Sequence, residues 1–296
     1  MSLVIDDVLV RNDPLGRRLP ILFDSPHSGR VYPQDIRFAC PLGLLRHAED
    51  SHVEELFASA PDHGATLLCA LFPRVCIDVN RAVDDIDPAL LDDSWPVPLN
   101  PTGRSAVGAG LIRSLLRPGL PLYDGKLSVA DVEERIGRYY RPYHSQMSQI
   151  LDGLAGRFGA VWHVNCHSMP SVLGPSVLGL SSSSAAEPLL ADFVIGDRDG
   201  ATSEPGFVQL VADTLRGYGY RVALNNPYKG VELVARYGDP ARGRHSIQLE
   251  INRRLYMNEE TLERHDGFAA LKAAIDSLIG RIAAYAADRR LSQAAE

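Results

Sequence analysis

Short runs of apolar and β-branched residues recur along the chain and predict β-strands. The predicted strands cover residues 20–23, 65–71, 75–79, 160–164, 193–196, 220–224 and 246–251. Several of these runs are apolar at nearly every position, which is typical of strands covered on both faces. The pattern therefore favours a central sheet between layers of helices.

Helical periodicity fills the intervals between these runs. Apolar positions in residues 42–60, 128–158 and 268–285 recur with helical spacing, and Ser128 stands where a helix N-cap is expected. Pro142 is expected to kink the second of these helices. Strands that alternate with helices predict an α/β fold, which we expect to be a mixed central sheet flanked by helices on both faces.

The length of 296 residues would allow two domains. No linker and no internal repeat separates two units, so we expect a single domain over residues 1–296. Residues 181–184 form a short serine-rich patch of low complexity. Hydrophobic residues make up 45% of the chain and charged residues 23%, which is typical of a folded, soluble protein.

Charge and cysteine usage narrow the function classes. A net charge of -7 gives no basic surface of the kind that binds nucleic acid. The four cysteines are widely spaced without a C-x-x-C pair, which is typical of reduced thiols. Neither a secretory signal nor an apolar run long enough to cross a membrane is visible. We therefore expect a cytoplasmic protein without nucleic-acid or membrane partners.

Signatures of several common α/β chemistries are absent from the sequence. There is no glycine-rich phosphate loop, no G-x-S-x-G serine elbow and no H-E-x-x-H helix. What remains is a set of histidines and carboxylates that follow predicted strands. Open α/β sheets place their sites at the carboxyl ends of strands, so these residues are the candidates for chemistry.

The first candidates for a metal site lie in the amino-terminal part of the chain. His27 stands in a turn, residues 25–29, directly after the first predicted strand. Asp50 and His52 lie in a predicted helix, and because residues two apart do not share a helix face, we prefer Asp50 as the ligand. The alternatives are a surface or capping role for His27 and helix-face pairing with Arg46 for Asp50.

A third candidate ligand follows the predicted strand at 160–164. His167 would lie at the carboxyl end of this strand, whereas His163 points to the same side but about 13 Å away, too far to share an ion. His163 is therefore predicted to be structural. Two histidines and a carboxylate at one sheet edge match an open zinc site that leaves a position for water, although another divalent metal is possible.

Glu250 interrupts an apolar strand with a charge that needs a partner when buried. A metal-bound water is one such partner, so Glu250 is our candidate general acid and base. The alternative is an ion pair with Arg253 or Arg254.

Positive charges supply candidates for substrate binding. The planar guanidinium of Arg81 suits a carboxylate, although pairing with Asp78 is the alternative. Lys229 and Arg236 add charge in a predicted loop, where each would more often be a solvated surface charge.

With these residues identified, the chain resembles the N-formylglutamate amidohydrolase family over about nine tenths of its length. Eight short motifs carry the resemblance in collinear order. They are Ser-Pro-His-Ser-Gly at 25–29, Asp-Ser-His at 50–52, Ile-Asp-Val-Asn-Arg at 77–81, Leu-Pro-Leu-Tyr-Asp-Gly at 120–125, Asn-Cys-His-Ser at 165–168, Pro-Tyr-Lys-Gly at 227–230, Arg-Tyr-Gly at 236–238, and Gln-Leu-Glu at 248–250 followed by Tyr-Met-Asn-Glu at 256–259.

The resemblance implies a zinc-carboxypeptidase-like α/β fold and the hydrolysis of an N-formyl amino acid, most simply N-formyl-L-glutamate, to formate and the free amino acid. It implies that the metal ligands are His27, Asp50 and His167 and that the catalytic carboxylate is Glu250. It also implies substrate contacts by Arg81, Asn80, Lys229 and Arg236, and support of the metal ligands by His52 and Ser168.

Two departures from the family pattern bear on the substrate. Val231 stands where a second glycine is expected, and residues 104–116 read unlike the corresponding family segment. Both affect the expected acyl group and amino acid more than the metal chemistry. The alternatives are a deacylase or carboxypeptidase-like hydrolase of another N-acyl amino acid, and a catalytically silent relative that binds a small acidic ligand.

Overall fold

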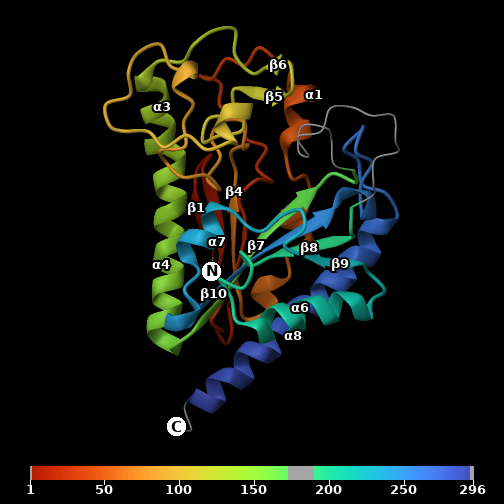
Figure 1. Ribbon diagram of the computed structural model, residues 1–296. Helices are drawn as coiled ribbons and strands as arrows, with labels where there is room; N and C mark the ends of the chain where they lie inside the picture. Colours follow the sequence, from red (N-terminus) through yellow and green to blue (C-terminus); the bar gives the residue numbers. More distant parts are fainter. Residues whose placement is uncertain (1, 173–189, 294–296) are drawn as a thin grey trace.

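The computed structural model describes residues 2–172 and 190–293, with side chains described up to residue 289. The serine-rich patch at 181–184 lies outside the described residues. The expected α/β fold, with a mixed central sheet flanked by helices on both faces, is confirmed (Figure 1). No helix among the described residues is long and apolar enough to cross a membrane.

Ten strands are present in the described part of the chain. They are β1 (Ser2–Ile5), β2 (Leu9–Asn12), β3 (Ile21–Ser25), β4 (Thr66–Ala70), β5 (Leu115–Arg117), β6 (Leu120–Pro121), β7 (Val161–Met169), β8 (Phe193–Gly196), β9 (Val222–Leu224) and β10 (Arg244–Asn252). Eight of the described strands form the main sheet in the order β1-β2-β4-β3-β7-β10-β8-β9, and β5 pairs with β6 in a separate hairpin.

The centre of the main sheet is parallel. Strands β4, β3, β7 and β10 run in one direction. The antiparallel pairs of this sheet are β1 with β2, β2 with β4, and β8 with β10. The carboxyl ends of β3, β7 and β10 therefore meet at the same edge of the sheet. The main sheet contains strands from residue 2 to residue 252. This arrangement supports the prediction of a single domain.

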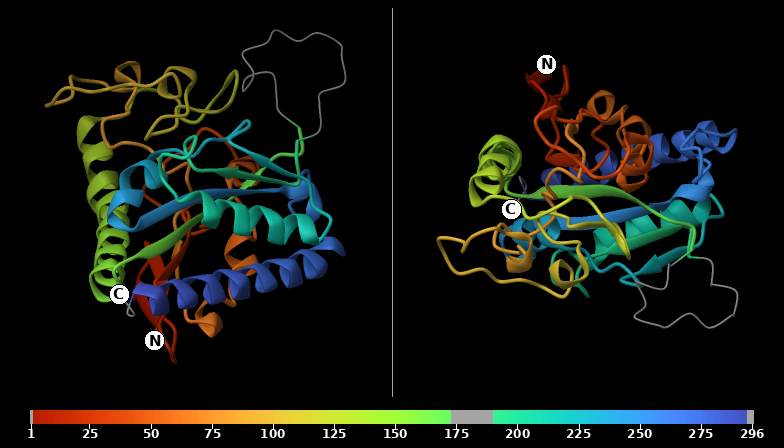
Figure 2. Two further views of the ribbon diagram at one scale, coloured as in Figure 1. Left: turned by 60° about the horizontal axis from the view of Figure 1, so that its bottom comes forward. Right: turned by 90° about the horizontal axis from the view of Figure 1, so that it is seen from above.

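Helices cover both faces of this sheet. They are α1 (Leu42–Leu45), α2 (Val53–Leu56), α3 (Val129–Arg135), α4 (Arg141–Phe158), α6 (Pro205–Gly217), α7 (Glu232–Tyr237) and α8 (Gly267–Gln293). Helices α2, α6 and α8 pack on one face, and α4 with α7 packs on the other, as Figure 2 shows. The apolar spacing predicted for residues 268–285 is the inward face of α8.

Alternation along the strands gives the two faces different side chains. On β7, Trp162, Val164 and Cys166 belong to the apolar core beneath α6 and α8. On the opposite side of the same strand, His163, Asn165 and His167 are buried polar residues. Because successive side chains of a strand point to opposite faces, one strand contributes to both the core and the polar row.

Two predictions about local structure are wrong. Residues 75–79 form no strand, although Val75, Ile77 and Val79 are buried in the core. Residues 42–60 do not form one continuous helix, because the chain breaks between the short helices α1 and α2 and His52 has a left-handed φ of 68°. The amino-terminal hairpin of β1 and β2 was not predicted, since its strands are only four residues long and lie mostly at the surface.

The helical region at 128–158 contains a π-helical turn close to Pro142, where the sequence predicts a kink. Ser128 caps α3 by accepting a hydrogen bond from the Asp131 backbone N–H. A π-helical turn, Ile136–Tyr140, then joins α3 to α4 directly before Pro142. Proline removes one helical hydrogen bond and crowds the carbonyl four residues earlier, and a widened turn accommodates both effects.

Candidate metal centre and substrate cavity

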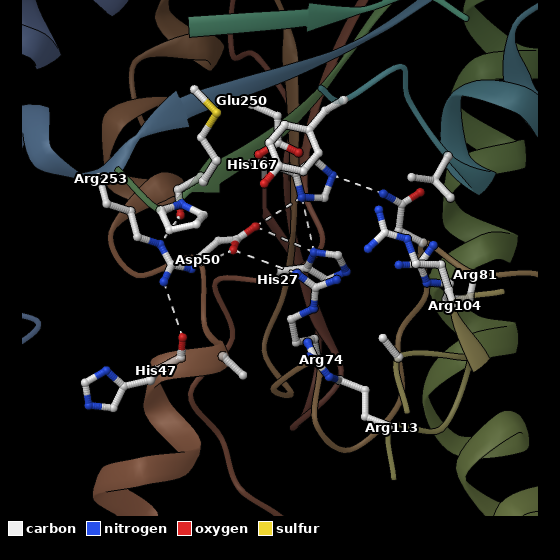
Figure 3. A pocket seen from close by; sticks show the side chains of 18 of the residues that line it. His27, His47, Asp50, Arg74, Arg81, Arg104, Arg113, His167, Glu250 and Arg253 are labelled. Carbon is white, nitrogen blue, oxygen red and sulfur yellow. Dashed lines mark hydrogen bonds and ion pairs between the residues drawn. The ribbon is translucent and has the colours of Figure 1, made fainter. Parts of the chain in front are cut away.

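A cavity of about 500 Å³ opens at the carboxyl edge of β3, β7 and β10. The long connection between β4 and α3, with the β5-β6 hairpin, lies over this edge (Figure 1). Figure 3 shows two histidines and an aspartate at the centre of the cavity, with arginines around them. The cavity lies where an α/β sheet is expected to place its site.

His27, Asp50 and His167 converge although they are far apart in the sequence. The Nδ1 atoms of His27 and His167 lie 3.1 Å apart. The Oδ2 atom of Asp50 lies 3.1 Å from His167 Nδ1 and 3.6 Å from His27 Nδ1. All three side chains are buried. The structure thus brings together the three residues predicted as metal ligands.

Local backbone structure positions the first two of these residues. His27 follows β3 in a turn that ends at Gly29, where a Cβ atom would lie 2.3 Å from the Phe72 carbonyl oxygen. Only glycine allows this close approach of two backbone segments. Asp50 lies in the break between α1 and α2, and its backbone N–H donates to the His27 carbonyl at 3.0 Å. The interrupted helix therefore places Asp50 beside His27.

The outer nitrogens of both histidines are held by other side chains. His27 Nε2 lies 2.7 Å from Asp78 Oδ1, and Asp78 also accepts from Arg74 Nη2 at 2.7 Å. His167 Nε2 lies 2.6 Å from Asn165 Oδ1. Such outer partners orient metal-binding histidines and fix which nitrogen carries the proton. Both Nδ1 atoms consequently face the shared space.

The carboxylates at this site are stabilised in their charged form. Burial alone would raise the pKa of Asp50, but hydrogen bonds from His167 and His27 outweigh it and hold the pKa well below the ordinary value. Burial likewise opposes ionisation of Asp78, and the charges of Arg74 and His27 overcome it, so the pKa of Asp78 is also well below the ordinary value. A carboxylate that stays ionised is a competent metal ligand.

The residues present fit a divalent metal. Ligand atoms at about 2.0–2.1 Å from a tetrahedral Zn²⁺ lie about 3.3 Å from one another. The three facing atoms lie 3.1–3.6 Å apart, which brackets that spacing. Two imidazole nitrogens and one carboxylate oxygen are a donor set that suits zinc in catalytic sites. This cluster is the candidate metal centre.

Glu250 lies on β10 directly beside His167 in the parallel register. It lines the cavity, and Gln248 Nε2 donates to its Oε1 at 2.7 Å. Burial raises the pKa of Glu250, with a further contribution from the nearby Asp50 charge. Among the described residues no ion pair joins Glu250 to an arginine, because Arg253 pairs with Asp50 and Arg254 with Asp192.

Six arginines line the described part of the cavity. They are Arg74, Arg81, Arg104, Arg113, Arg117 and Arg253. Arg74 and Arg253 are engaged with Asp78 and Asp50, whereas Arg81 Nε lies 4.0 Å from Asp78 and Arg113 Nε has no hydrogen-bond partner among the described residues.

Burial and the neighbouring charges of the cavity affect Arg113. Burial lowers the pKa of Arg113 to about 10, helped by the nearby Arg74. The arginines that line the cavity outnumber its carboxylates, so the cavity has a net positive charge. This charge favours an anionic ligand.

Asn80 and Ser168, two of the other predicted residues, line the cavity. The Asn80 side-chain oxygen accepts from the Leu233 backbone N–H, which leaves its Nδ2 facing His167. Ser168 accepts a hydrogen bond from Arg253 Nε, and Arg253 in turn contacts Asp50.

Three predicted residues lie elsewhere. His52 contacts Glu55 and the Leu262 carbonyl, so it does not reach the histidine pair. Lys229 is exposed and pairs with Asp199. Arg236 pairs with Glu232 on its own helix and lies over the Tyr140 ring. The structure therefore does not place these three residues at the cavity, and Arg104 and Arg113 supply the positive charge instead.

Several residues of the site were missed from the sequence. Asp78 and Asn165 belong to segments that we had singled out, yet neither was assigned to a histidine. Asn165 lies two positions before His167, and strand alternation puts such residues on the same face. That spacing is a signal that was available. Arg104 and Arg113 come from an irregular loop, where no periodicity indicates direction.

The fold and the site define the class of this protein, and comparisons with known proteins define its family. The fold and the imidazole-carboxylate cluster define an α/β protein with a candidate hydrolytic metal centre. The family model described as N-formylglutamate amidohydrolase matches residues 19–257. The chain belongs to the N-formylglutamate amidohydrolase family.

Individual relatives agree with this assignment. A crystal structure of an N-formylglutamate amidohydrolase from Ralstonia eutropha JMP134 is 49% identical with a TM-score of 0.90, and the match covers 95% of this chain and 99% of that one. An N-formylglutamate deformylase of Pseudomonas putida is 29% identical over 286 residues, covering 92% and 95% of the two chains.

A more distant structure shares the fold. A gene product of Agrobacterium tumefaciens is 17% identical with a TM-score of 0.64, and the match covers 98% of this chain and 97% of that one.

Proposed function

We propose that this chain is a metal-dependent amidohydrolase that converts N-formyl-L-glutamate to formate and L-glutamate. One observation carries the proposal: His27 Nδ1, His167 Nδ1 and Asp50 Oδ2 face one another within 3.6 Å, beside Glu250, in an arginine-lined cavity. The names of the relatives at 49% and 29% identity support the substrate. A cytoplasmic location remains part of the proposal on sequence grounds alone.

The three converging residues would hold Zn²⁺ or another divalent cation. When bound, such a cation lowers the pKa of a coordinated water to near 7 and polarises a carbonyl group. The chain supplies the fixed geometry for this. Asp78 and Asn165 hold the outer nitrogens of the two histidines, so the inner nitrogens keep their direction.

Glu250 is assigned the proton transfers. Its raised pKa and its position beside His167 suit a carboxylate that takes a proton from the attacking water. The same group then returns that proton to the departing nitrogen, which is necessary because an amide anion is too basic to leave unprotonated. Gln248 holds the Glu250 carboxylate in place at 2.7 Å.

The arginines are assigned the carboxylates of the substrate. N-Formylglutamate carries two carboxylates, and a guanidinium can bind each with two parallel hydrogen bonds. Arg104 and Arg113 line the cavity without an ion pair to a carboxylate among the described residues, and Arg81 has only a 4.0 Å contact with Asp78. We expect Arg81 to bind one substrate carboxylate, because it lines the cavity close to the candidate metal centre.

A substrate panel tests the reaction and separates the alternatives. Formate release from N-formylglutamate by zinc-loaded protein is the expected result, with slower turnover of N-formyl amino acids that have neutral side chains. Preferential hydrolysis of N-acetyl or N-succinyl amino acids would instead assign another deacylase. No turnover of any member, together with tight binding of acidic ligands, would assign a silent ligand-binding relative.

Replacing Arg81→Gln tests the anchor. A hydrogen bond to a charged group is worth about 1.5–3 kcal/mol, so KM for N-formylglutamate should rise about 10- to 150-fold while the protein keeps its zinc content. Lys229→Gln is the matched control, because Lys229 is 59% exposed and lies outside the cavity lining. An unchanged KM in Arg81→Gln, or an equal rise in both variants, would contradict the assignment.

A further inference from the structure

A row of polar side chains crosses three neighbouring strands beneath the candidate metal centre. Asp24 on β3 lies beside Asn165 on β7 in the register of the sheet, and Asn165 lies beside Gln248 on β10. All three are buried. Buried polar groups of this kind are expected to be fully hydrogen-bonded, so the direction of each bond is constrained.

Asn165 connects this row to a histidine of the metal centre. Its Nδ2 donates to Asp24 Oδ1 at 2.9 Å, and its Oδ1 lies 2.6 Å from His167 Nε2. The amide thus contacts a carboxylate on one side and an imidazole on the other. The side-chain oxygen of Asn165 can accept a hydrogen bond from His167 only if the NH₂ group of the same amide faces Asp24.

Asp24 imposes that orientation. An ionised carboxylate accepts hydrogen bonds and cannot donate, so the group of Asn165 that faces it must be NH₂. His163 Nε2 and the Tyr143 hydroxyl also lie 2.7 Å from Asp24 oxygens, as donors. Although burial opposes ionisation, the hydrogen bond and charge of His163 outweigh it and lower the pKa of Asp24.

No competing acceptor faces the same nitrogen in the described part of the chain. Asn80 Nδ2 lies 3.2 Å from His167 Nε2, but the Asn80 oxygen is occupied by the Leu233 backbone N–H at 2.9 Å. The group that Asn80 presents is therefore a donor. A proton on His167 Nε2 has one acceptor within reach, which is Asn165 Oδ1.

We propose that Asn165 is a positioning residue whose amide, oriented by Asp24, holds His167 with its proton on Nε2 and its lone pair on Nδ1. The Nδ1 lone pair then points at His27 and Asp50, which is the form that can bind a cation. This inference rests on the proposed metal centre. It adds a chain from Asp24 through Asn165 to His167 that acts without touching substrate.

Zinc affinity of three single variants tests the chain. Asn165→Leu removes the acceptor, so the zinc dissociation constant, measured by competition with a chromophoric chelator, should rise about 10- to 100-fold. Asn165→Asp keeps an oxygen toward His167 and should stay within about threefold of the parent protein. Ser246→Ala is the control, because it removes a buried hydrogen bond to His163 on the same face of the sheet without reaching His167.

The outcomes separate positioning from simple structural support. A zinc dissociation constant in Asn165→Leu equal to that of the parent would overturn the proposal. So would equal weakening in Asn165→Leu and Ser246→Ala, since this would mean that any lost hydrogen bond among the buried polar groups of this face has the same effect. Retained affinity in Asn165→Asp alone, with a lower melting temperature from repulsion by Asp24, supports it.

A spectroscopic measurement determines which nitrogen of His167 carries the proton in the parent protein itself. In zinc-loaded protein with labelled histidine, the ring ¹⁵N shifts of His167, assigned by their loss in His167→Asn, should show a protonated Nε2 and a metal-bound Nδ1. A protonated Nδ1 would overturn the proposal. This readout also distinguishes the two proposals, because the tautomer is defined whether or not the protein releases formate.

Discussion

The two faces of the central sheet are built from the same strands, but they differ in chemistry along β7 and β10. On β10, Ile247, Leu249 and Ile251 pack into the apolar core, while Gln248 and Glu250 face the polar row and the cavity. The apolar face stabilises the fold by removing surface from water. The other face has an apolar core of its own beneath α4, to which Leu22 and Leu68 belong, but its polar part on β7 and β10 depends on hydrogen bonds being complete.

This difference indicates how the protein combines rigidity with chemistry. Of the candidate catalytic groups, His167 and Glu250 lie on β7 and β10, whose opposite sides are fixed in the core, whereas His27 and Asp50 lie in connections next to these strands. Sites on strands are held more accurately than sites on loops. The arginines come mainly from the long connection after β4, which places the substrate-binding part on the less regular segment.

The largest expected effect comes from changing the polar face alone. Glu250→Gln keeps the shape of the side chain but removes the proton acceptor, so turnover should fall about 10²- to 10⁴-fold. Formate release under saturating substrate measures this, and zinc content by elemental analysis serves as the control. Turnover close to that of the parent protein would remove Glu250 from the mechanism.

At Leu249, one residue before Glu250, we expect the opposite pattern: a loss of stability without a loss of turnover. Leu249 is fully buried on the apolar face, so Leu249→Ala should lower the free energy of unfolding by about 2–5 kcal/mol. Denaturant unfolding measures the loss. The turnover number per folded molecule should stay within a factor of a few, because Leu249 does not line the cavity. A large loss of turnover with unchanged stability would show that the two faces are not separable in this way.

The smallest effect concerns the stability of the polar face itself. Because burial raises the pKa of Glu250, the folded state binds its proton more tightly than the unfolded state. This stabilisation is complete below the unfolded pKa of about 4.3 and is lost as the pH rises through the higher folded pKa. Metal-free Glu250→Gln should therefore be more stable than the parent at neutral pH and equally stable or less stable in acid.

A pair of unfolding curves at neutral and acidic pH checks this sign. Greater stability of the parent at neutral pH would mean that the charged Glu250 is favoured by its surroundings. In that case the carboxylate would be stabilised by the nearby cations rather than penalised by burial.

The class of fold was predictable because its signals are local. Apolar runs such as residues 160–164 and 193–196 correspond to β7 and β8, and the helical spacing at 268–285 corresponds to α8. Residues 75–79 have the same apolar character but form no strand, because they pack in the core without joining the sheet. Composition cannot distinguish these two kinds of burial.

The centre of the site was predictable for a different reason. His27 and His167 directly follow strand signals, so topology brings them to one edge. Asp50 was preferred over His52 on the assumption of an intact helix, whereas the structure orients Asp50 by breaking that helix. Arg113 and Asp78 depend on long-range contacts, which spacing along the chain does not encode, whereas the two-residue spacing of Asn165 and His167 was available in the sequence.

The most direct test of the central claim is a crystal of the zinc-loaded protein measured at the zinc absorption edge. We expect one strong anomalous peak bounded by His27 Nδ1, His167 Nδ1 and Asp50 Oδ2, which already lie 3.1–3.6 Å apart. An active, zinc-dependent enzyme whose anomalous peak lies away from these three atoms would contradict the account.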